Sequence, residues 1–259
     1  DVVFQAVAKI APERSNGCAY GTINALSLAG HRSDGRRWVM FSFFGGGHGG
    51  HPEGDGLNHG NAPISTATIP PLEILEAAYP VKFTQWALRE GSGGPGRHRG
   101  GLGAVYEIEL LEEEADVFLF GERGRFPPRG VAGGGDGATN RFLYPKDGEM
   151  VEPPMTSKLH GAKLKRGERV RLETPGGGGY GPPDERDPAL VQRDKALDMR
   201  EQGVCRPLAK QLHDGVEINV VVRLPMDTDV EELKELKARG LGIVYLGLES
   251  GNPEVLKRI

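Results

Sequence analysis

Histidine and carboxylate side chains gather in one glycine-rich stretch, FFGGGHGGHPEGDGLNHGN, which spans residues 43–61. Its members His48, His51 and Asp55 are of types that ligate divalent metals, and histidine and aspartate also transfer protons. The spacing does not match the helical histidine pair of zinc proteases, so His48 and His51 form only a weak metal signature. Asp55 is the best side-chain candidate for catalysis in this stretch, although the residue pattern alone fits a turn-stabilising role equally well.

The glycines of the same stretch offer a second kind of chemistry. Successive backbone N–H groups, such as those of Gly46 and Gly47, can form a nest that binds an anion or an oxyanion. The plainer alternative is that the glycines serve tight turns, the histidines are solvated, and Asp55 stabilises a turn with Gly56. We favour turn geometry at the wall of a pocket, where the backbone of Gly46 and Gly47 and the carboxylate of Asp55 would act.

A second glycine loop, GSGGPGRHRGG at residues 91–101, carries Arg97 and Arg99. Guanidinium groups bind carboxylates or phosphates through paired hydrogen bonds, so both arginines are candidates for substrate binding. The alternative is an exposed basic turn. The loop lacks the Gly-Lys-Ser/Thr ending of a phosphate-binding loop, and we do not infer nucleotide binding from it. A further run, PGGGGYG at residues 175–181, is most simply a tight chain reversal.

Composition narrows the class of protein that carries these loops. The chain has 259 residues, and its 40 glycines are about twice the typical share of about 7%. The net charge of −4 gives no electrostatic case for nucleic acid or an anionic membrane, and no apolar stretch approaches the roughly 20 residues of a spanning helix. Two cysteines are too few for a disulfide framework, which favours a cytoplasmic location. Because the chain opens at Asp1 with neither a signal peptide nor an initiator methionine, we expect it to start inside a longer protein.

Strands alternating with glycine loops are expected over most of the chain. Apolar residues at helical spacing predict a helix at 2–10, and a proline-bounded helical turn is expected at 70–80. Two strands within residues 24–44 should be joined by the turn Ser33-Asp34-Gly35. Further strands are expected at 81–88, 104–111, 115–122 and 167–174. The fold class is α+β, strand-rich with long glycine-rich loops.

The alternation of strands and glycine loops ends near Asp187. A charged helical stretch is followed by continuous apolar strands at 216–224 and 242–251, with an amphipathic helix at 229–239 between them. This strand–helix–strand–helix order is unlike anything before residue 187, so we place a domain boundary at about 190–200.

The glycine motifs occur in an order that resembles a known family. GGGHGGHPEGDG, PPLEILEAAYPV, LREGSGGPGRHRGGLGAVYEIELL, GERGRFPPRGVAGGGDGATN and LETPGGGGYGPPDERDP together resemble the C-terminal part of the hydantoinase B/oxoprolinase family. The resemblance covers residues 1–193. Within its first motif Gly46, Gly47 and Asp55 match the family pattern, whereas His48 and His51 stand where family members often have apolar or small residues.

The resemblance implies a B-type component of an ATP-dependent hydrolase that opens cyclic amides such as hydantoins or 5-oxoproline. It implies an A-type partner subunit that uses ATP. The family's metal-type His/Asp pattern belongs to the N-terminal half of the B-type part, which this chain does not contain, so a divalent metal is left open and the chain is expected to be inactive alone. Two alternatives are a fragment of an acetone- or acetophenone-type carboxylase and a non-catalytic assembly module.

Residues 200–259 resemble the middle of the barrel of a different family, the radical S-adenosylmethionine enzymes, which implies that this βαβα segment is an incomplete fragment of a barrel. The resemblance maps a cofactor-approaching strand end onto Gly247, Glu249 and Ser250. Such chemistry needs three closely spaced cysteines, and this segment has only Cys205, so neither S-adenosylmethionine nor an iron–sulfur cluster is expected. A radical enzyme is the weakest alternative. We interpret the chain as a join of two unrelated fragments, through gene fusion or sequence assembly.

Overall fold

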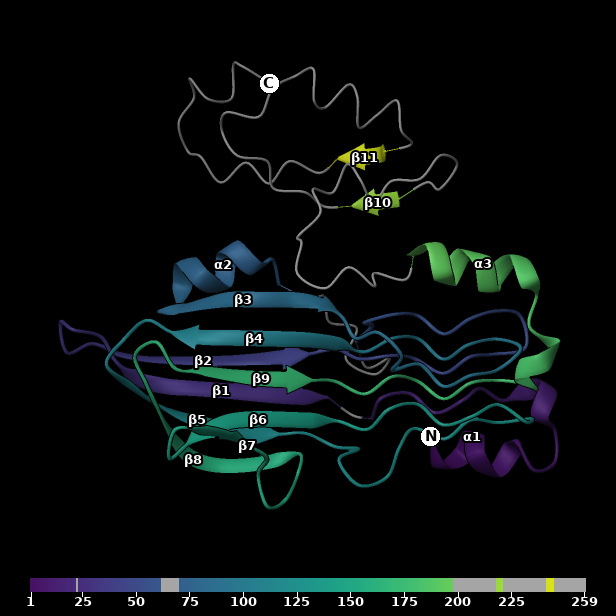
Figure 1. Cartoon of the computed structure of the whole chain (residues 1–259), viewed down its shortest axis with the longest axis horizontal. Coiled ribbons are helices and arrows are strands. Elements are labelled where there is room, and N and C mark those ends of the chain that lie inside the picture. Colours follow the sequence, from purple (N-terminus) through teal and green to yellow (C-terminus); the bar gives the residue numbers. More distant parts are fainter. Residues whose placement is uncertain (22, 62–69, 198–217, 221–240, 245–259) are drawn as a thin grey trace. The chain divides into compact units, whose positions relative to one another are not determined.

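The computed structural model describes residues 1–21, 23–61, 70–197, 218–220 and 241–244 (Figure 1). The chain divides into two compact units, Asp1–Arg200 and Glu201–Ile259. In chain order the elements are α1 (Val2–Val7), η1 (Pro12–Arg14), β1 (Asn24–His31), β2 (Arg37–Phe44), α2 (Leu72–Ala78), β3 (Val81–Leu88), β4 (Ala104–Leu110), β5 (Glu114–Phe120), β6 (Arg141–Lys146), β7 (Glu149–Val151), β8 (Lys158–Lys165), β9 (Arg169–Glu173), η2 (Pro183–Glu185), α3 (Pro188–Leu197), β10 (Ile218–Val220) and β11 (Leu241–Val244).

Two antiparallel sheets form the body of the first unit. The four-stranded sheet has the order β2-β1-β5-β8, and the five-stranded sheet has the order β3-β4-β9-β6-β7. The core lies between them, where Leu26, Met40 and Leu119 of the first sheet meet Tyr106 and Leu172 of the second, each no more than 1% exposed. The predicted strand-rich α+β class is therefore confirmed.

Local sequence explains the first hairpin. β2 alternates exposed and buried side chains along its whole length, as a strand with one face on a core must. Gly35 supplies the positive φ of +82° in the turn between β1 and β2. The predicted pair of strands within 24–44 is confirmed, with Asn24 opposite Phe44 and His31 opposite Arg37.

Other boundaries differ from the sequence prediction. The first helix ends at Val7 rather than at residue 10. The expected period-two alternation of β3 holds only as far as Thr84, because the register with β4 shifts between Phe83 and Gln85. Strands β6, β7 and β8 were not predicted, since none of them has a regular alternation of buried and exposed side chains.

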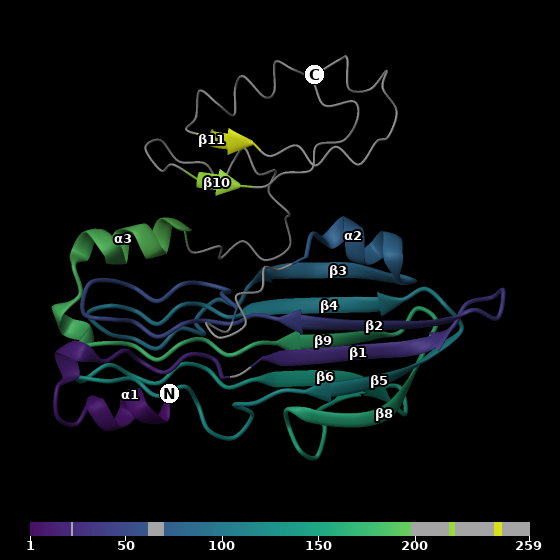
Figure 2. The same cartoon turned by 180° about the vertical axis from the view of Figure 1, so that it is seen from behind.

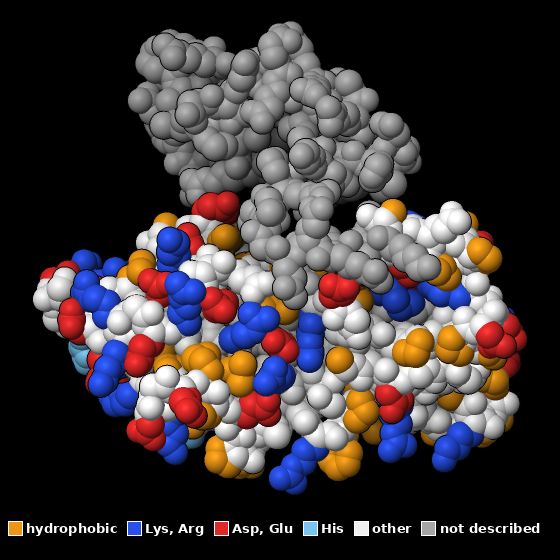
Figure 3. All heavy atoms as spheres, viewed as in Figure 1, with side chains coloured by type: hydrophobic (Ala, Val, Ile, Leu, Met, Phe, Trp, Pro, Cys, Tyr) orange, Lys and Arg blue, Asp and Glu red, His pale blue; other side chains and the backbone are white. Residues whose placement is uncertain are grey.

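The outer face of the five-stranded sheet is charged. Arg169 of β9 pairs with Glu107 and Glu109 of β4 at 3.1 and 3.0 Å, and Arg171 pairs with Glu173 at 2.8 Å. Acidic and basic side chains are interspersed across the face of the molecule seen in Figure 3. Such mixed charge is what a solvated surface requires.

Beyond the strand ends, glycine-rich segments run side by side as extended chain (Figures 1 and 2). The segment at 176–181 is central, because three successive N–H groups, those of residues 177–179, each donate to a different neighbouring segment. Their acceptors are the carbonyl oxygens of Gly101, Cys18 and Gly135, at 2.8, 2.9 and 2.9 Å. Three successive N–H groups that point in three directions match the repeat of a polyproline II helix, which has three residues per turn. Such a helix makes no hydrogen bonds within itself, so here its neighbours stabilise it. We call this arrangement the glycine bundle.

Glycine is required in the bundle because the segments approach too closely for side chains. A Cβ added at Gly47 would overlap the carbonyl oxygen of Gly101, and one at Gly177 would overlap the carbonyl oxygen of His48. Both overlaps are with backbone, so no rotamer change relieves them. Glycine here serves close approach of chains, a role shared with the axis of collagen.

The turn interpretation of these runs is therefore wrong. No residue of 45–50 has a positive φ, and within 175–181 only Gly181 does, at +72°. The predicted chain reversal at 175–181 is instead the straight central segment of the bundle, because hydrogen bonds to distant segments replace the local bond that a turn would supply.

In the second unit, β10 and β11 form a parallel pair. The residues assigned to a cofactor in the sequence analysis, Gly247, Glu249 and Ser250, lie outside the described residues, as does Cys205. Among the helices in the described part of the chain, none has the length and apolar character needed to cross a bilayer.

Candidate functional site

An open hollow of about 1130 Å³ lies beside Asp55. Its wall combines the glycine segment after β2, the start of α1, the loop after β5 and the residues just before β8. Three cationic side chains line it, those of Arg123, Arg125 and Lys158. Three of the candidate residues, His48, His51 and Asp55, line the hollow, so it is the candidate functional site.

Two loops with strained backbone form one side of the hollow. Arg123 has φ of +63° and Thr156 has φ of +51°, values that non-glycine residues seldom adopt. The loops are tied together because the N–H of Gly121 donates to Ser157 O at 2.8 Å and Lys158 Nζ donates to Gly121 O at 3.1 Å. Strained residues held in place by their surroundings are frequent at functional sites.

The cations of the hollow differ in their partners. Arg123 forms an ion pair with Asp1, while its buried Nε has no hydrogen-bond partner in the described structure. Arg125 is exposed and makes no ion pair with any described residue. The guanidinium of Arg125 is thus available to an anion that enters the hollow.

His48 and His51 both line the hollow but do not converge. His48 Nε2 lies 2.7 Å from the backbone oxygen of Asn61, and its ring stacks on Tyr20 with centroids 6.2 Å apart. The N–H of His51 donates to Gly54 O at 3.0 Å within a local turn. Over the described ranges, no group of three or more histidine, cysteine or acidic side chains could hold a metal ion. Metal binding by His48 and His51 therefore stays a prediction without structural support.

The backbone N–H groups of Gly46 and Gly47 already have partners. Gly46 donates to Gly60 O at 3.0 Å, and Gly47 donates to Pro175 O at 2.9 Å. Because each N–H provides a single donor, neither is free to bind an oxyanion. This corrects the predicted oxyanion role: the two glycines build the bundle that supports the hollow.

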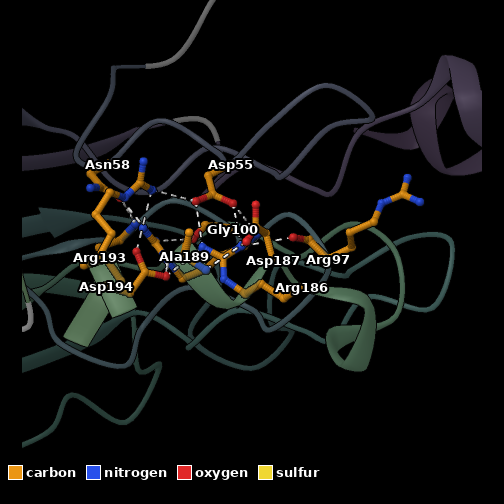
Figure 4. Close-up of polar contacts among 11 residues, drawn as sticks. Asp55, Asn58, Arg97, Gly100, Arg186, Asp187, Ala189, Arg193 and Asp194 are labelled. Carbon is orange, nitrogen blue, oxygen red and sulfur yellow. Dashed lines mark hydrogen bonds and ion pairs between the residues drawn. The ribbon is translucent and has the colours of Figure 1, made fainter. Parts of the chain in front are cut away.

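Asp55 is the centre of an arginine cluster (Figure 4). Arg186 binds both carboxylate oxygens, with Nη1–Oδ1 at 2.7 Å and Nη2–Oδ2 at 2.8 Å. The N–H of Arg99 donates to Oδ1 at 2.8 Å, and Arg193 Nη2 donates to Oδ2 at 3.0 Å. The side chains of Asp55 and Arg186 are only 13% and 10% exposed, so this bidentate pair is largely shielded from water.

These contacts decide the protonation state of Asp55. Burial alone would raise the pKa of the carboxyl, but hydrogen bonds from Arg186 and Arg99 and the charges of both arginines outweigh it and lower the pKa to about 2. A general acid or base works best with a pKa near the operating pH. At neutral pH Asp55 is thus a fixed anion that positions arginines, and its geometry fits a positioning role rather than proton transfer.

Arg97 and Arg99 lie close together but have different partners. Arg97 Nη1 pairs with Glu185 at 3.3 Å, with its guanidinium carbon 5.8 Å from the ring centre of Tyr180. Arg99 Nε pairs with Asp194 at 3.3 Å. The predicted anion-binding arginines are therefore already engaged by acidic side chains of η2 and α3.

Arg186 is the residue that sequence reasoning missed. It lies 131 positions from Asp55, in the short connection between η2 and α3. Arg186 also pairs with Asp194 at 2.7 Å, which joins α3 to the same cluster. The only signal was the alternation of acidic and basic residues in PPDERDP, which does not identify a distant partner.

His59 belongs to a cluster of aromatic side chains. Its Nε2 contacts the hydroxyl of Tyr106, and its ring lies edge-on to Trp86 at 6.0 Å. Burial lowers the pKa of His59 to about 4. The imidazole is therefore neutral at pH 7, and it serves as a hydrogen-bonding member of the core.

Comparison with known proteins places these features in a family. The family model for hydantoinase B/oxoprolinase matches residues 1–183. The chain is 32% identical to the caprolactamase subunit beta of Pseudomonas jessenii over 206 residues, which cover 75% of this chain and 35% of that protein. It is 33% identical to 5-oxoprolinase 1 of Arabidopsis thaliana over 165 residues, which cover 63% of this chain and 12% of that protein.

A solved structure supports the same relationship. The crystal structure of ATP-dependent caprolactamase from Pseudomonas jessenii superposes with a TM-score of 0.62 at 29% sequence identity, over 74% of this chain and 34% of that one. The chain spans about a third or less of the length of the curated relatives that it matches.

Proposed function

Because the chain belongs to the hydantoinase B/oxoprolinase family, we propose that it acts in the ATP-dependent hydrolysis of a cyclic amide, as part of a B-type component. The family match over residues 1–183 is the observation that carries the proposal. Two relatives are named for 5-oxoproline and caprolactam, and both compounds are rings closed by an amide bond. The chemical class of substrate proposed here is accordingly a lactam or a related cyclic amide.

The proposed reaction divides between two components. ATP, bound by an A-type partner, would supply the phosphoryl group that activates the ring amide at its oxygen. Water then attacks the amide carbon and the C–N bond breaks, which leaves a free amine and an acyl phosphate. A second water releases phosphate from the acyl group, so that ATP, lactam and two waters become ADP, phosphate and an amino acid. The negative charge that develops needs preorganised donors or cations.

The hollow is where we place this chain's contribution. Support comes from the free guanidinium of Arg125 and from Lys158, both of which line it. Asp55 contributes indirectly, because its arginine cluster fixes the glycine segment that forms one wall. Proton transfer is assigned to no side chain of the described residues.

The remaining parts of the chain are proposed on sequence grounds. Residues 1–193 form the family region and residues 200–259 a separate βα fragment of barrel type, with Gly247, Glu249 and Ser250 near a cofactor only if that barrel is complete. We propose a cytoplasmic location for the assembly.

Reconstitution tests the proposal. The chain is mixed with an A-type subunit, with a polypeptide carrying the rest of a B-type component, and with ATP and 5-oxoproline or caprolactam. Ring-opened amino acid, measured by mass spectrometry, should appear only when the chain and ATP are both present. Arg125→Ala should lower turnover, whereas Arg166→Ala, at an exposed position outside the hollow, should not. Ring opening that proceeds equally without the chain contradicts the proposal, and a complex without turnover favours an assembly module.

A further inference from the structure

The outer face of the four-stranded sheet is unusually apolar. Along β2 the outward side chains Val39, Phe41 and Phe43 are 43%, 54% and 41% exposed. On β5 Phe120 is 57% exposed. An antiparallel sheet with one face on the core normally carries polar side chains on its other face, as the five-stranded sheet does here.

The strand register gathers these side chains into one surface. Phe41 lies opposite Ser27 of β1, which lies opposite Phe118 of β5; one step along, Phe43 lies opposite Ala25, which lies opposite Phe120. Small residues of β1 thus separate two rows of phenylalanines. We call the set Val39, Phe41, Phe43, Phe118 and Phe120 the aromatic face.

The rings pack on one another, yet Phe41, Phe43 and Phe120 remain 41–57% exposed. Phe41 and Phe43 meet edge to face at 5.0 Å, and Phe118 meets His160 edge to face at 5.3 Å. A contiguous exposed patch of this kind marks an interaction surface more often than a solvated one. Moreover, β2 is the edge strand of its sheet, so one side of its backbone ladder has no partner among the described strands.

We infer that the aromatic face and the edge of β2 dock the rest of a B-type polypeptide, the portion of family members that this chain does not match. The inference rests on the proposed function. The chain covers 35% of the caprolactamase subunit beta, so about two thirds of such a subunit must be accommodated elsewhere. The charged face of the five-stranded sheet is already satisfied by its own ion pairs. The occupant must therefore present apolar side chains, and a strand added beside β2 would extend the sheet.

A binding experiment tests the inference without requiring turnover. The portion of the Pseudomonas jessenii caprolactamase subunit beta outside the matched region is expressed as a separate chain, and its affinity for the 259-residue chain is measured by sedimentation velocity. The double variant Phe41→Ser/Phe43→Ser should weaken binding at least tenfold. The matched control Leu111→Ser/Met150→Ser, at positions 44% and 46% exposed, should stay within twofold.

Several outcomes would overturn the inference. Among these are the absence of a complex and equal affinities of the two double variants. A concentration-dependent homodimer that Phe41→Ser/Phe43→Ser abolishes would identify a second copy as the occupant instead. If that variant unfolds, the single variant Phe120→Ser on β5 is scored in its place. A complex that responds to these substitutions but opens no ring would support the docking surface and contradict the proposed function.

Discussion

Arg186 holds Asp55 through two parallel hydrogen bonds, 2.7 and 2.8 Å long, across 131 positions of sequence. The pair joins the segment after η2 to the glycine-rich stretch that carries both histidines of the hollow. The two pKa shifts are consistent with one ion pair. Contact with Arg186 lowers the pKa of Asp55, and contact with Asp55 raises the pKa of Arg186, so each group is held in its charged form. The pair is consequently a structural tie beside the hollow.

Removing the carboxylate should destabilise the protein. Asp55→Ala leaves Arg186 largely buried without its main partner, and we expect the free energy of unfolding to fall by about 2–3 kcal/mol. Asp34→Ala is the control, because the Asp34–Arg36 pair is exposed and should contribute far less to stability than the buried pair. Urea denaturation at pH 7 measures both.

The same tie has a pH signature. Because the folded pKa of Asp55 is depressed, its stabilisation is present above about pH 4 and is lost as pH falls through about 2. Asp55→Asn should flatten the unfolding free energy across that window relative to wild type. If the unfolding free energies of the two proteins changed with pH in parallel, Asp55 would not form a stabilising ion pair.

His59 should give a second pH dependence, at higher pH. Its folded pKa of about 4 lies below the unfolded value of 6.5, so the unfolded chain binds more protons between these values. Stability should therefore decrease as pH falls from 6.5 to 4. His59→Asn removes this slope while tolerating the positive φ of 46°, and urea titrations at several pH values test it. An unchanged slope would assign the effect to another group.

The glycine bundle should not tolerate the smallest side chain. Gly47→Ala and Gly177→Ala place a methyl group against backbone, and each should cost about 3 kcal/mol or more, or prevent folding. Gly54→Ala is the matched control in the same stretch, since its Cβ would meet only the His51 ring, at 3.4 Å. We expect it to stay within about 1 kcal/mol of wild type. Thermal unfolding of the three variants compares them, and equal destabilisation would contradict close packing.

Two truncated chains test whether α3 stabilises the first unit. A chain ending at residue 200 should keep the urea midpoint of the first unit, whereas a chain ending at residue 183 loses Arg186 and Arg193 from the cluster around Asp55. We expect the shorter chain to be less stable by about 2 kcal/mol or more. Equal midpoints for the two truncated chains would show that α3 contributes nothing.

Sequence patterns predicted the elements whose signals are local. The hairpin at 24–44 follows from alternation and a turn triplet, both contained within a few residues. The charged stretch that forms α3 was recognised as helical, but the contact of Arg186 with Asp55 was not, because an ion pair between distant segments leaves no period in the sequence.

The conformation of the glycine runs could not be predicted from local sequence. A run such as 175–181 has the same composition whether it turns or extends, and the choice depends on which other segments lie beside it. The hollow was inferred only as a pocket wall near Asp55, and its cations Arg123 and Lys158 come from the loop after β5 and from the start of β8, far along the chain. The conformation of the glycine run and the lining of the hollow both depend on long-range packing, which no short motif encodes.

The central segment of the glycine bundle, residues 176–181, is also the last of its segments to be synthesised. Segments near Cys18, Gly101 and Gly135 emerge from the ribosome earlier, with backbone groups that only the late segment can satisfy. Contacts of such long sequence separation form slowly. During translation the backbone groups that pair with this segment therefore stay bonded to water until the four consecutive glycines at 176–179 have been synthesised.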